Sequence, residues 1–432
     1  MEIIYYIRDE LLKKGADDVV LEFNRSEGTQ LRFANNKIVK TGTEILSNLS
    51  VFAVQKNKII STSLKDLNKD SADELIKNIF KFLKQTEPNH DYRGIAKGPF
   101  KYKEIENGYD KNVLNFDEVD LLNKGINAAL ENSKRVAGIL ESSINNSHLV
   151  TSNNVDVEDK STGLYFSIRA LNEKDESGHM NSCSRTLNRL KVEQSARKAG
   201  EIAKLAKNPI NLEAGKYDVI LGYMPMASLF NYVMDACSIF NVEAGLSFFK
   251  DKLGKKIGNF NLIDDGTLDN GYNSSKFDAE GIPCQKNFIV ENGVLKTYLH
   301  NTSSAIRYKT RTTANAGLIS PSPFNILFDT KKEDIFKQKK AIYITNIWYT
   351  RFQNYITGDF STIPRDAIFL IENGEIKKSL KNIRISDNML NILKNIKSCS
   401  KVSEQLRSWE AEIPCVTPEV LIKDVNITKP HE

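Results

Sequence analysis

Residues 289–296 read Ile-Val-Glu-Asn-Gly-Val-Leu-Lys, and residues 370–377 read Leu-Ile-Glu-Asn-Gly-Glu-Ile-Lys. In each stretch an Asn-Gly pair separates two short apolar runs. A type I′ turn needs positive φ at both central residues, which Asn and Gly tolerate, so each stretch predicts a tight β-hairpin. The similarity favours two similar hairpins over a domain-scale repeat. Hairpins of this kind predict a largely antiparallel sheet with helices on it, hence an α+β fold.

The chain upstream of these hairpins begins with a compact unit. Apolar residues at helical spacing predict a helix over the first fifteen residues. Short apolar runs then predict strands at 19–23, 30–34, 37–40, 49–54 and 58–61. Ser71 and Glu74 form a capping-box pattern, which predicts the start of a second helix. Together these elements predict an N-terminal α+β unit over residues 1–88.

A second unit follows a turn-rich connector at 88–112. The pattern predicts a helix beginning near Asp117, then strands, then a long helix that ends before Pro209, a domain boundary. This gives a middle α+β unit over residues 112–208. Strand patterns dominate beyond it, which predicts a mostly antiparallel, β-rich C-terminal domain over residues 212–432.

The composition is typical of a soluble globular protein, with 40% hydrophobic and 27% charged residues among 432. No run of about 18 apolar residues occurs, so we expect no membrane span. The first ten residues are unlike a secretory signal, and we expect a cytoplasmic protein. The net charge of +5 is dispersed along the chain, whereas nucleic-acid binders concentrate basic residues on one face or tail. We therefore expect no nucleic-acid partner.

The five cysteines are dispersed along the chain, and their odd number and wide spacing disfavour a disulfide framework or a zinc knuckle. We expect them to be buried free thiols. They are Cys183, Cys237, Cys284, Cys399 and Cys415.

Four segments point to a known family by their sequence, their order and their spacing. The segments are Leu246–Ile257, Leu262–Thr267 (Leu-Ile-Asp-Asp-Gly-Thr), Phe277–Ile282 (Phe-Asp-Ala-Glu-Gly-Ile) and Phe288–Leu295. Their order resembles that of the TldD/PmbA family, and the similarity continues through residues 302–305, 314–317, 357–361, 370–388 and 390–396. The resemblance covers nearly the whole chain, although it is weak in the N-terminal part.

The resemblance also predicts which branch of the family this chain joins. TldD-type members carry His-Glu-x-x-x-His at the place held here by Phe230, Asn231 and Asp235. Such a helical motif supplies imidazoles to zinc and a carboxylate to its water, and Phe and Asn supply neither. The cysteine that completes the TldD-type site aligns near Glu404. The chain therefore resembles the metal-less PmbA (TldE) branch, for which we expect no cofactor.

The resemblance implies a heterodimer in which a TldD-type metallopeptidase subunit carries the zinc. The metal-less subunit would contribute walls and substrate-binding strands to a chamber that admits small or unfolded peptides. A homodimer in the absence of that partner stays open. Thr357, Gly358, Asp359 and Phe360 match an element of PmbA-type members; we expect a turn or bulge there, with peptide contact as the alternative.

Two other functions remain as alternatives. A self-sufficient peptidase could use Asp235 together with the loop at Asp264–Asp265. A stand-alone regulatory binding protein is the other alternative, since family members have been described as gyrase modulators. The carboxylates of Asp264, Asp265, Asp278 and Glu280 stand among glycines, so we expect polar loop residues. Arg365 and Asp366 replace small residues and Gly of many relatives, so the local loop is expected to differ.

Overall fold

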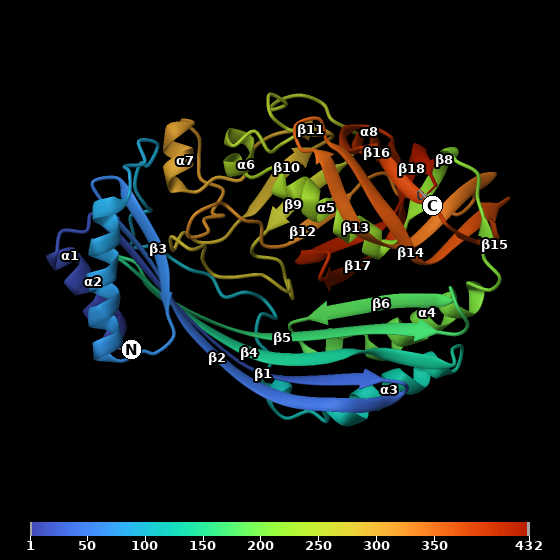
Figure 1. The fold of residues 1–432 in the computed structure, drawn as a ribbon, viewed down its shortest axis with the longest axis horizontal. Helices are drawn as coiled ribbons and strands as arrows, with labels where there is room; N and C mark the ends of the chain where they lie inside the picture. Colours follow the sequence, from blue (N-terminus) through green and yellow to red (C-terminus); the bar gives the residue numbers. More distant parts are fainter. Residues whose placement is uncertain (1, 430–432) are drawn as a thin grey trace.

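The computed structural model describes residues 2–429 and has two lobes, each built on one sheet (Figure 1). The N-terminal lobe (residues 2–206) holds a six-stranded antiparallel sheet in the order β3-β2-β1-β4-β5-β6. Its helices are α1 (Glu2–Lys13), α2 (Lys69–Gln85), α3 (Glu118–Leu130) and α4 (Val192–Leu205), with short 3-10 helices at Lys111–Leu114 and Leu187–Arg189. Its strands are β1 (Asp18–Ala34), β2 (Lys37–Gln55), β3 (Lys58–Leu64), β4 (Arg135–Thr151), β5 (Asp156–Leu171) and β6 (Ser177–Ser184).

The strands of this sheet are longer than the sequence predicts. Residues 19–23 and 30–34 belong to one strand, β1, so the prediction of two separate strands is wrong. The polar residues 24–29 do not alternate with apolar ones, but they pair with β2 on one side and with β4 on the other. Backbone hydrogen bonds to two neighbouring strands stabilise this part of β1, where there are no apolar side chains to bury.

The sheet also crosses the predicted boundary between the first two units. β1 pairs with β4 from Val20, opposite Thr151, to Phe33, opposite Gly138. The segments predicted as 1–88 and 112–208 therefore share one hydrogen-bonded sheet. In Figure 1, α1 and α2 stand at one end of it, and α3 and α4 cover the convex side at the other end.

Alternation along β1 divides its apolar side chains between two cores. Val19 and Leu21 pack in the cluster under α1 and α2. Val20 points to the opposite face, where it shares a cluster with Phe52 and with Phe277 of the C-terminal lobe. One strand thus joins the local helices and the other lobe.

Helix α2 begins three residues earlier than the capping-box pattern predicts. Its N-cap is Asn68, whose side chain accepts a hydrogen bond from the backbone N–H of Ser71 at 2.9 Å. Asn, like Ser, is a favoured N-cap residue, and two caps close together in sequence cannot be ranked by pattern alone. The predicted α3 and α4 are confirmed, with Asp117 capping α3.

The C-terminal lobe (residues 210–429) is built on a twelve-stranded sheet. Its strands are β7 (Ile210–Asn211), β8 (Gly215–Leu221), β9 (Asn261–Asp265), β10 (Lys286–Glu291), β11 (Val294–Leu295), β12 (Ile326–Asp329), β13 (Lys340–Asn354), β14 (Asp359–Glu372), β15 (Glu375–Lys381), β16 (Arg384–Asn388), β17 (Ile396–Ser408) and β18 (Ala411–Thr428). Its helices are α5 (Tyr223–Asp235), α6 (Ile239–Glu243), α7 (Thr302–Arg307) and α8 (Met389–Lys394).

This sheet confirms the predicted α+β class with a mostly antiparallel C-terminal region. Parallel pairing is confined, within residues 2–429, to β12 with β18, β8 with β13 and β7 with β15, apart from isolated bridges. Both predicted hairpins form. Asn292 and Gly293 have φ of 50° and 82°, and Asn373 and Gly374 have φ of 51° and 84°. These are the positive values that the Asn-Gly pattern predicts for a type I′ turn.

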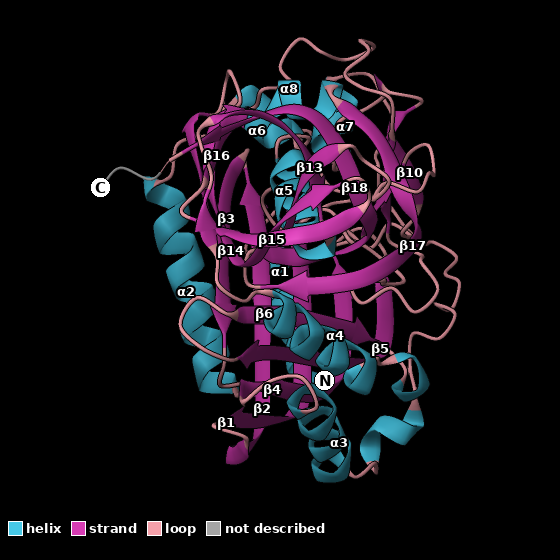
Figure 2. Ribbon diagram, turned by 90° about the vertical axis from the view of Figure 1, so that its right-hand side faces the viewer, coloured by secondary structure: helices cyan, strands magenta, loops and turns pink. Residues whose placement is uncertain are grey.

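Helix α5 fills the centre of the C-terminal lobe, among its strands (Figure 2). Nine of its thirteen residues are buried, because apolar side chains occupy almost its whole circumference. It begins at Tyr223, six residues before the segment predicted as helical. Within the described residues, no helix has the length and apolar character needed to cross a membrane.

Candidate functional site

A cavity with a volume of about 1360 Å³ lies between the two lobes. Figure 1 shows the long strands of the N-terminal sheet curving beneath the C-terminal lobe, and their concave face forms one wall. Asn24, Asn146 and Ser161 line that wall. The C-terminal lobe contributes Asp278 and, from the β17–β18 hairpin, Arg407. The polar middle of the long strands therefore faces an internal space.

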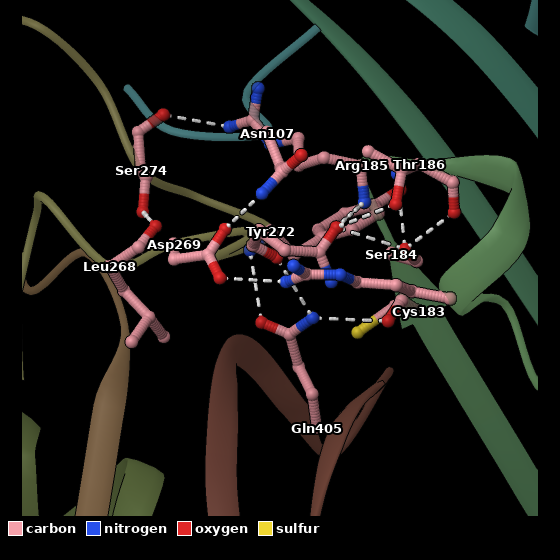
Figure 3. Close-up of polar contacts among 12 residues, drawn as sticks. Asn107, Cys183, Ser184, Arg185, Thr186, Leu268, Asp269, Tyr272, Ser274 and Gln405 are labelled. Carbon is pink, nitrogen blue, oxygen red and sulfur yellow. Dashed lines mark hydrogen bonds and ion pairs between the residues drawn. The ribbon is translucent and has the colours of Figure 1, made fainter. Parts of the chain in front are cut away.

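One wall of this cavity is a polar joint between the lobes, which we call the Arg185 joint (Figure 3). The Arg185 guanidinium is buried and donates to the backbone carbonyls of Gly271 at 3.1 Å and Ser274 at 2.8 Å. Gln405 donates to the carbonyls of Cys183 and Asn270, both at 3.1 Å. Because the acceptors are backbone carbonyls, the joint fixes the path of the 270–275 loop.

A second polar cluster joins the lobes at the other end of β6, near Ser177, and we call it the Asp366 joint. The buried Asp366 carboxylate pairs with Arg169 at 3.0 Å and accepts hydrogen bonds from Ser177 and Asn346, both at 2.8 Å. Burial lowers the pKa of the neighbouring His179 to about 4. The Asp366 pKa is also lowered, because burial, which raises it, is outweighed by the cationic and donor groups around the carboxylate. Asp366, where the sequence predicts a local loop that differs from that of relatives, therefore connects the two lobes.

The three positions matched to the metal motif have structural roles on α5. Phe230 is buried, with its ring 4.6 Å from that of Phe328 and 6.2 Å from that of Phe260. Asn231 exchanges two hydrogen bonds, both 2.9 Å, with the backbone of Ile413 on β18. The ring contacts of Phe230 and the hydrogen bonds of Asn231 hold the helix in place.

Asp235, the third position, is exposed and lines a smaller cavity of about 400 Å³ together with Asn231. Partial burial raises its pKa, opposed by a hydrogen bond from Asn241. This cavity shares Trp409 and Ile413 with the 1360 Å³ cavity, so the end of α5 borders the space between the lobes.

Glu404 does not join these positions, although the resemblance places the third metal ligand near it. Glu404 pairs with Lys191 at 2.5 Å and lines a separate cavity of about 450 Å³. The α5 residue in that cavity is Tyr223, at the beginning of the helix. Glu404 therefore lines a different cavity from Asn231 and Asp235.

The residues present do not fit a zinc site of the TldD type. Helix α5 contains no His and no Glu in any of its turns, and its sole acidic residue is Asp235. His148 pairs with Asp156 at 2.8 Å, and His179 belongs to the Asp366 joint. His431 lies outside the described residues. Between residues 2 and 429, no three His, Cys, Asp or Glu side chains gather in a geometry that could hold a metal ion.

The residues predicted as groove candidates end the turn between β13 and β14 (Thr357 and Gly358) and begin β14 (Asp359 and Phe360). Gly358 has φ of 85°, and a side chain there would also approach Phe248 to 3.3 Å. Thr357 donates to Asp359 at 2.5 Å, and Asn388 clamps the turn by donating to both residues. Phe360 is buried. This is the predicted turn; none of its four residues lines the cavities described above.

The four carboxylates predicted to be polar loop residues are buried. Asp264 and Asp265 lie at the buried end of β9, and Asp278 and Glu280 are also buried. Asp264 accepts from Asn315 at 2.6 Å and from the Phe324 backbone at 2.7 Å. Hydrogen bonds of this kind let a buried carboxylate fix the loops that donate to it. Residue type and nearby glycines do not predict such burial.

Burial raises the pKa of three carboxyls in this group, to about 7 for Asp264 and Asp278 and about 8 for Glu280. Asp278 lines the 1360 Å³ cavity, while Glu280 lines a separate cavity of about 210 Å³. Asp264 lines none of the cavities described, and the structure does not bring it together with Asp235. All five cysteines are buried free thiols, as predicted.

Two family models match the chain. The model for the PmbA/TldA metallopeptidase C-terminal domain matches residues 214–429, and the model for the central domain matches residues 112–207. An uncharacterized protein of Methanocaldococcus jannaschii is 33% identical over 64% of this chain and 68% of its own length.

Relatives of both branches also match. A Metalloprotease TldD homolog from Buchnera aphidicola is 28% identical over 59% of this chain and 57% of its own length. A Metalloprotease PmbA homolog from the same species is 26% identical over 68% and 67%. TldE from Thermococcus kodakarensis has the same fold, with a TM-score of 0.86 at 21% identity, covering 99% of this chain and all of that chain. The chain belongs to the PmbA/TldD metallopeptidase family.

Proposed function

We propose that this chain is the metal-free, PmbA-type subunit of a heterodimeric peptidase. In this proposal a TldD-type subunit carries the zinc and performs the hydrolysis. The chain described here forms one wall of the chamber and binds small or unfolded peptides. It contributes no catalytic residue, and it has no peptidase activity alone.

The composition of α5 is the observation that carries the proposal. Zinc peptidases of this class need two imidazoles and a carboxylate on one helix. Residues 223–235 offer no imidazole and a single carboxylate, that of Asp235, whichever turn of the helix is aligned with the motif. The similar identities to TldD and PmbA homologues, 28% and 26%, leave the branch to be decided by these residues.

The cavity between the lobes supports the role in peptide binding. Its volume of about 1360 Å³ exceeds the roughly 300–1,000 Å³ of ordinary small-molecule sites. Its walls carry many neutral side-chain amides and hydroxyls, among them Asn24, Asn48 and Ser161. Such groups exchange hydrogen bonds with a peptide main chain without selecting one side chain.

The geometry gives less support to a self-sufficient peptidase. Asp235 and Asp264, the two carboxylates named for that alternative, do not share a cavity. Asp264 is fully buried and already accepts two hydrogen bonds, so it has no access to a substrate. General acid–base catalysis requires the group to reach the substrate proton directly or through one water molecule.

The test is to co-express this chain with the TldD-type chain of the same genome. Peptide cleavage and metal content are measured for this chain alone, for the partner alone and for the complex, with and without a chelator. We expect chelator-sensitive cleavage in samples that contain the partner, highest in the complex, and no metal bound by this chain alone. Chelator-sensitive cleavage by this chain alone would contradict the proposal.

A variant pair tests the chamber wall within the active complex. Asn146→Trp places a bulky side chain in the 1360 Å³ cavity, whereas Glu44→Trp places one on an exposed part of β2 outside it. We expect kcat/KM for a peptide substrate to fall at least about tenfold with Asn146→Trp and to stay unchanged with Glu44→Trp. Equal activity of the two variants would remove this wall from the substrate path.

A further inference from the structure

One arginine of the 1360 Å³ cavity takes no part in the two interlobe joints. Arg407 lies on β17, two residues after Gln405, and its side chain is partly buried. Within residues 2–429 its guanidinium makes no hydrogen bond, and no carboxylate oxygen lies within 4.0 Å of its nitrogen atoms. None of these nitrogens is enclosed by protein, so the guanidinium presents its N–H donors to the cavity.

Two tyrosine rings, one from each lobe, hold this guanidinium in place. Its Cζ atom lies 5.8 Å from the ring centroid of Tyr165 on β5 and 5.5 Å from that of Tyr272 in the 270–275 loop. Both tyrosines line the cavity. An arginine stacks on an aromatic face while the N–H donors at the edge of its plane stay available. The two rings therefore position the charge without neutralising it.

The Tyr272 ring is itself fixed by both lobes. Its backbone N–H donates to Oε1 of Gln405 at 3.1 Å (Figure 3). Its hydroxyl lies over Gly163 of β5, where a Cβ atom would be 3.2 Å from Tyr272 Oη and 2.8 Å from Ser143 Oγ. The absence of a side chain at residue 163 makes room for the ring. Arg407 thus lies in a site that is assembled before any ligand binds.

Two guanidinium groups lie in this part of the cavity, against one carboxylate. Arg185 also lines the cavity, and it donates to backbone carbonyls rather than to a carboxylate. The carboxylate is that of Glu141 on β4, which accepts a hydrogen bond from Gln30 at 2.7 Å. Burial raises the pKa of Tyr272 to about 12, and Arg407 opposes this rise more strongly than Glu141 adds to it. The local balance is positive and favours an anionic ligand.

The other carboxylates of the cavity are engaged elsewhere or lie apart from this site. Asp159 lies 3.9 Å from the Lys276 ammonium and accepts from the Lys276 backbone at 3.1 Å. Asp278 accepts three backbone hydrogen bonds. Glu22 lies on β1 eight residues before the partner of Glu141, and Glu412 is exposed on β18. Among the described residues, none places an oxygen within 4.0 Å of the Arg407 guanidinium.

The shape of the guanidinium narrows the chemistry of the ligand. A planar guanidinium donates two parallel hydrogen bonds to a carboxylate, and these charge-assisted bonds are about twice as strong as those to a neutral carbonyl. A peptide carries a carboxylate at its C-terminus or on an acidic side chain. Either group can reach Arg407 from the cavity, because the guanidinium nitrogens face that space.

We propose that Arg407 binds a carboxylate of the peptide that occupies the cavity between the lobes. The two tyrosine rings keep the guanidinium in position, and the charge of Arg185 adds to the attraction. This subunit therefore selects peptides that carry a negative charge at this point. The choice of a peptide rests on the proposed function, whereas the need for an anionic group comes from Arg407 and its surroundings.

The test measures binding to the full chain without a partner subunit, by isothermal titration calorimetry. The probes are acetyl-Ala-Ala-Ser-Ala-Ala with a free C-terminal carboxylate, the same peptide with a C-terminal amide, the amide peptide with Glu in place of Ser, and inorganic phosphate. We expect a peptide with a carboxylate to bind at least about tenfold more tightly than the uncharged amide. A preference for the free acid assigns the C-terminus, and a preference for the Glu peptide assigns the side chain.

Three variants assign this preference to Arg407. Arg407→Gln removes the charge, and Arg407→Lys keeps the charge but removes the planar pair of donors. Arg365→Gln is the matched control, since the Arg365 guanidinium stacks 4.1 Å from the Trp348 ring centroid and lines none of the four cavities. We expect the preferred peptide to bind at least about tenfold more weakly to Arg407→Gln and about threefold more weakly to Arg407→Lys. Binding of the uncharged amide should stay unchanged in all three variants.

Two results would overturn the proposal and leave the proposed function standing. Equal binding of the three peptides would show that the cavity takes a peptide without reading its charge. An equal loss of charged and uncharged peptides in Arg407→Gln, or in Arg407→Lys if the first variant fails to fold, would assign Arg407 a structural role. Phosphate binding as tight as that of the preferred peptide would show a general anion site and would also overturn the proposal. Absence of binding by every peptide would instead contradict the peptide-binding role itself, on which this proposal rests.

Discussion

The two lobes build their sheets in different ways. In the N-terminal lobe, residues 39–47 of β2 are exposed, and the strand is held there by hydrogen bonds to β1. In the C-terminal lobe, residues 341–347 of β13 are continuously buried. The N-terminal sheet therefore leaves its concave face available for binding. The C-terminal sheet is covered on both faces and packs opposite that concave face.

The hydrophobic cores differ in the same sense. The C-terminal lobe has one large cluster that surrounds α5 and reaches the strands on both sides of it, and a smaller cluster that it shares with Ile202 of α4. The N-terminal lobe has separate clusters of similar size under α1 and α2 and under α3 and α4. The large cluster should lose its structure cooperatively, whereas separate clusters allow one end of a sheet to open first.

The largest expected effect comes from breaking the C-terminal core. Phe260→Ala removes a ring that is 2% exposed and packs against Phe230 and Phe328. We expect a loss of about 3–5 kcal/mol in the free energy of unfolding, measured by urea denaturation. Hydrogen exchange should show lost protection across the C-terminal lobe, with β1 and β4 less affected. Equal loss in both lobes would contradict the contrast between them.

The next largest effect tests the Asp366 joint. Asp366→Ala leaves the Arg169 guanidinium without its interlobe carboxylate, and we expect a loss of about 3 kcal/mol by the same measurement. Asp334→Ala serves as control, because Asp334 pairs with Lys337 at the exposed surface and should contribute less than about 1 kcal/mol. If both variants lose the same stability, the joint does not hold the lobes.

Acid pH should weaken the C-terminal lobe through His300. Burial lowers its pKa to about 4, so the folded state keeps the ring neutral while the unfolded state, with a pKa near 6.5, binds a proton. This titration does not reduce the free energy of unfolding above about pH 6.5, and it reduces that free energy progressively as pH falls towards 4.

The His300→Asn variant isolates this effect from the buried carboxyls, whose raised pKa values act in the opposite direction. The stability of the wild type minus that of the variant should fall by about 2 kcal/mol between pH 7.5 and 5. Urea denaturation at several pH values measures the difference. A difference that does not change with pH would show that the ring is not buried as described.

The smallest effect tests the beginning of α2 in the N-terminal lobe. Asn68→Ala should cost about 1 kcal/mol, because the Ser71 backbone N–H loses its side-chain acceptor. Ser71→Ala, at the N-cap that the sequence predicts, should cost less than about 0.5 kcal/mol. Thermal denaturation of the two variants decides between the caps. A larger loss in Ser71→Ala would restore the capping box.

Predictions that rest on local backbone chemistry agree with the structure. The hairpins at Asn292–Gly293 and Asn373–Gly374 form because positive φ is a property of the residues themselves. Helix α4 lies where its apolar spacing predicts it. The strand lengths in the N-terminal lobe could not be predicted, since residues 24–29 become a strand through two partner strands that are distant in sequence.

The candidate site also combines features that residue identity determines with features that depend on distant contacts. That α5 carries no His is a fact of sequence, and it alone predicts a chain without the TldD-type metal ligands. The neighbours of Glu404 could not be predicted, because an alignment gives the order of residues and not the cavity in which they meet. The burial of Asp264 and Asp278 was missed because most of the donors to these carboxylates are backbone N–H groups, which have no sequence signature.

The sequence by itself determined the family, the α+β class, the turns and the absence of an imidazole pair on α5, because each depends on residue identity or on neighbours in the chain. The tertiary structure alone decided the cavity between the lobes, the joints at Arg185 and Asp366, and the position of the Arg407 guanidinium against two tyrosine rings. These features arise from contacts between segments far apart in sequence, whose burial and hydrogen-bond partners exist only after both lobes have folded.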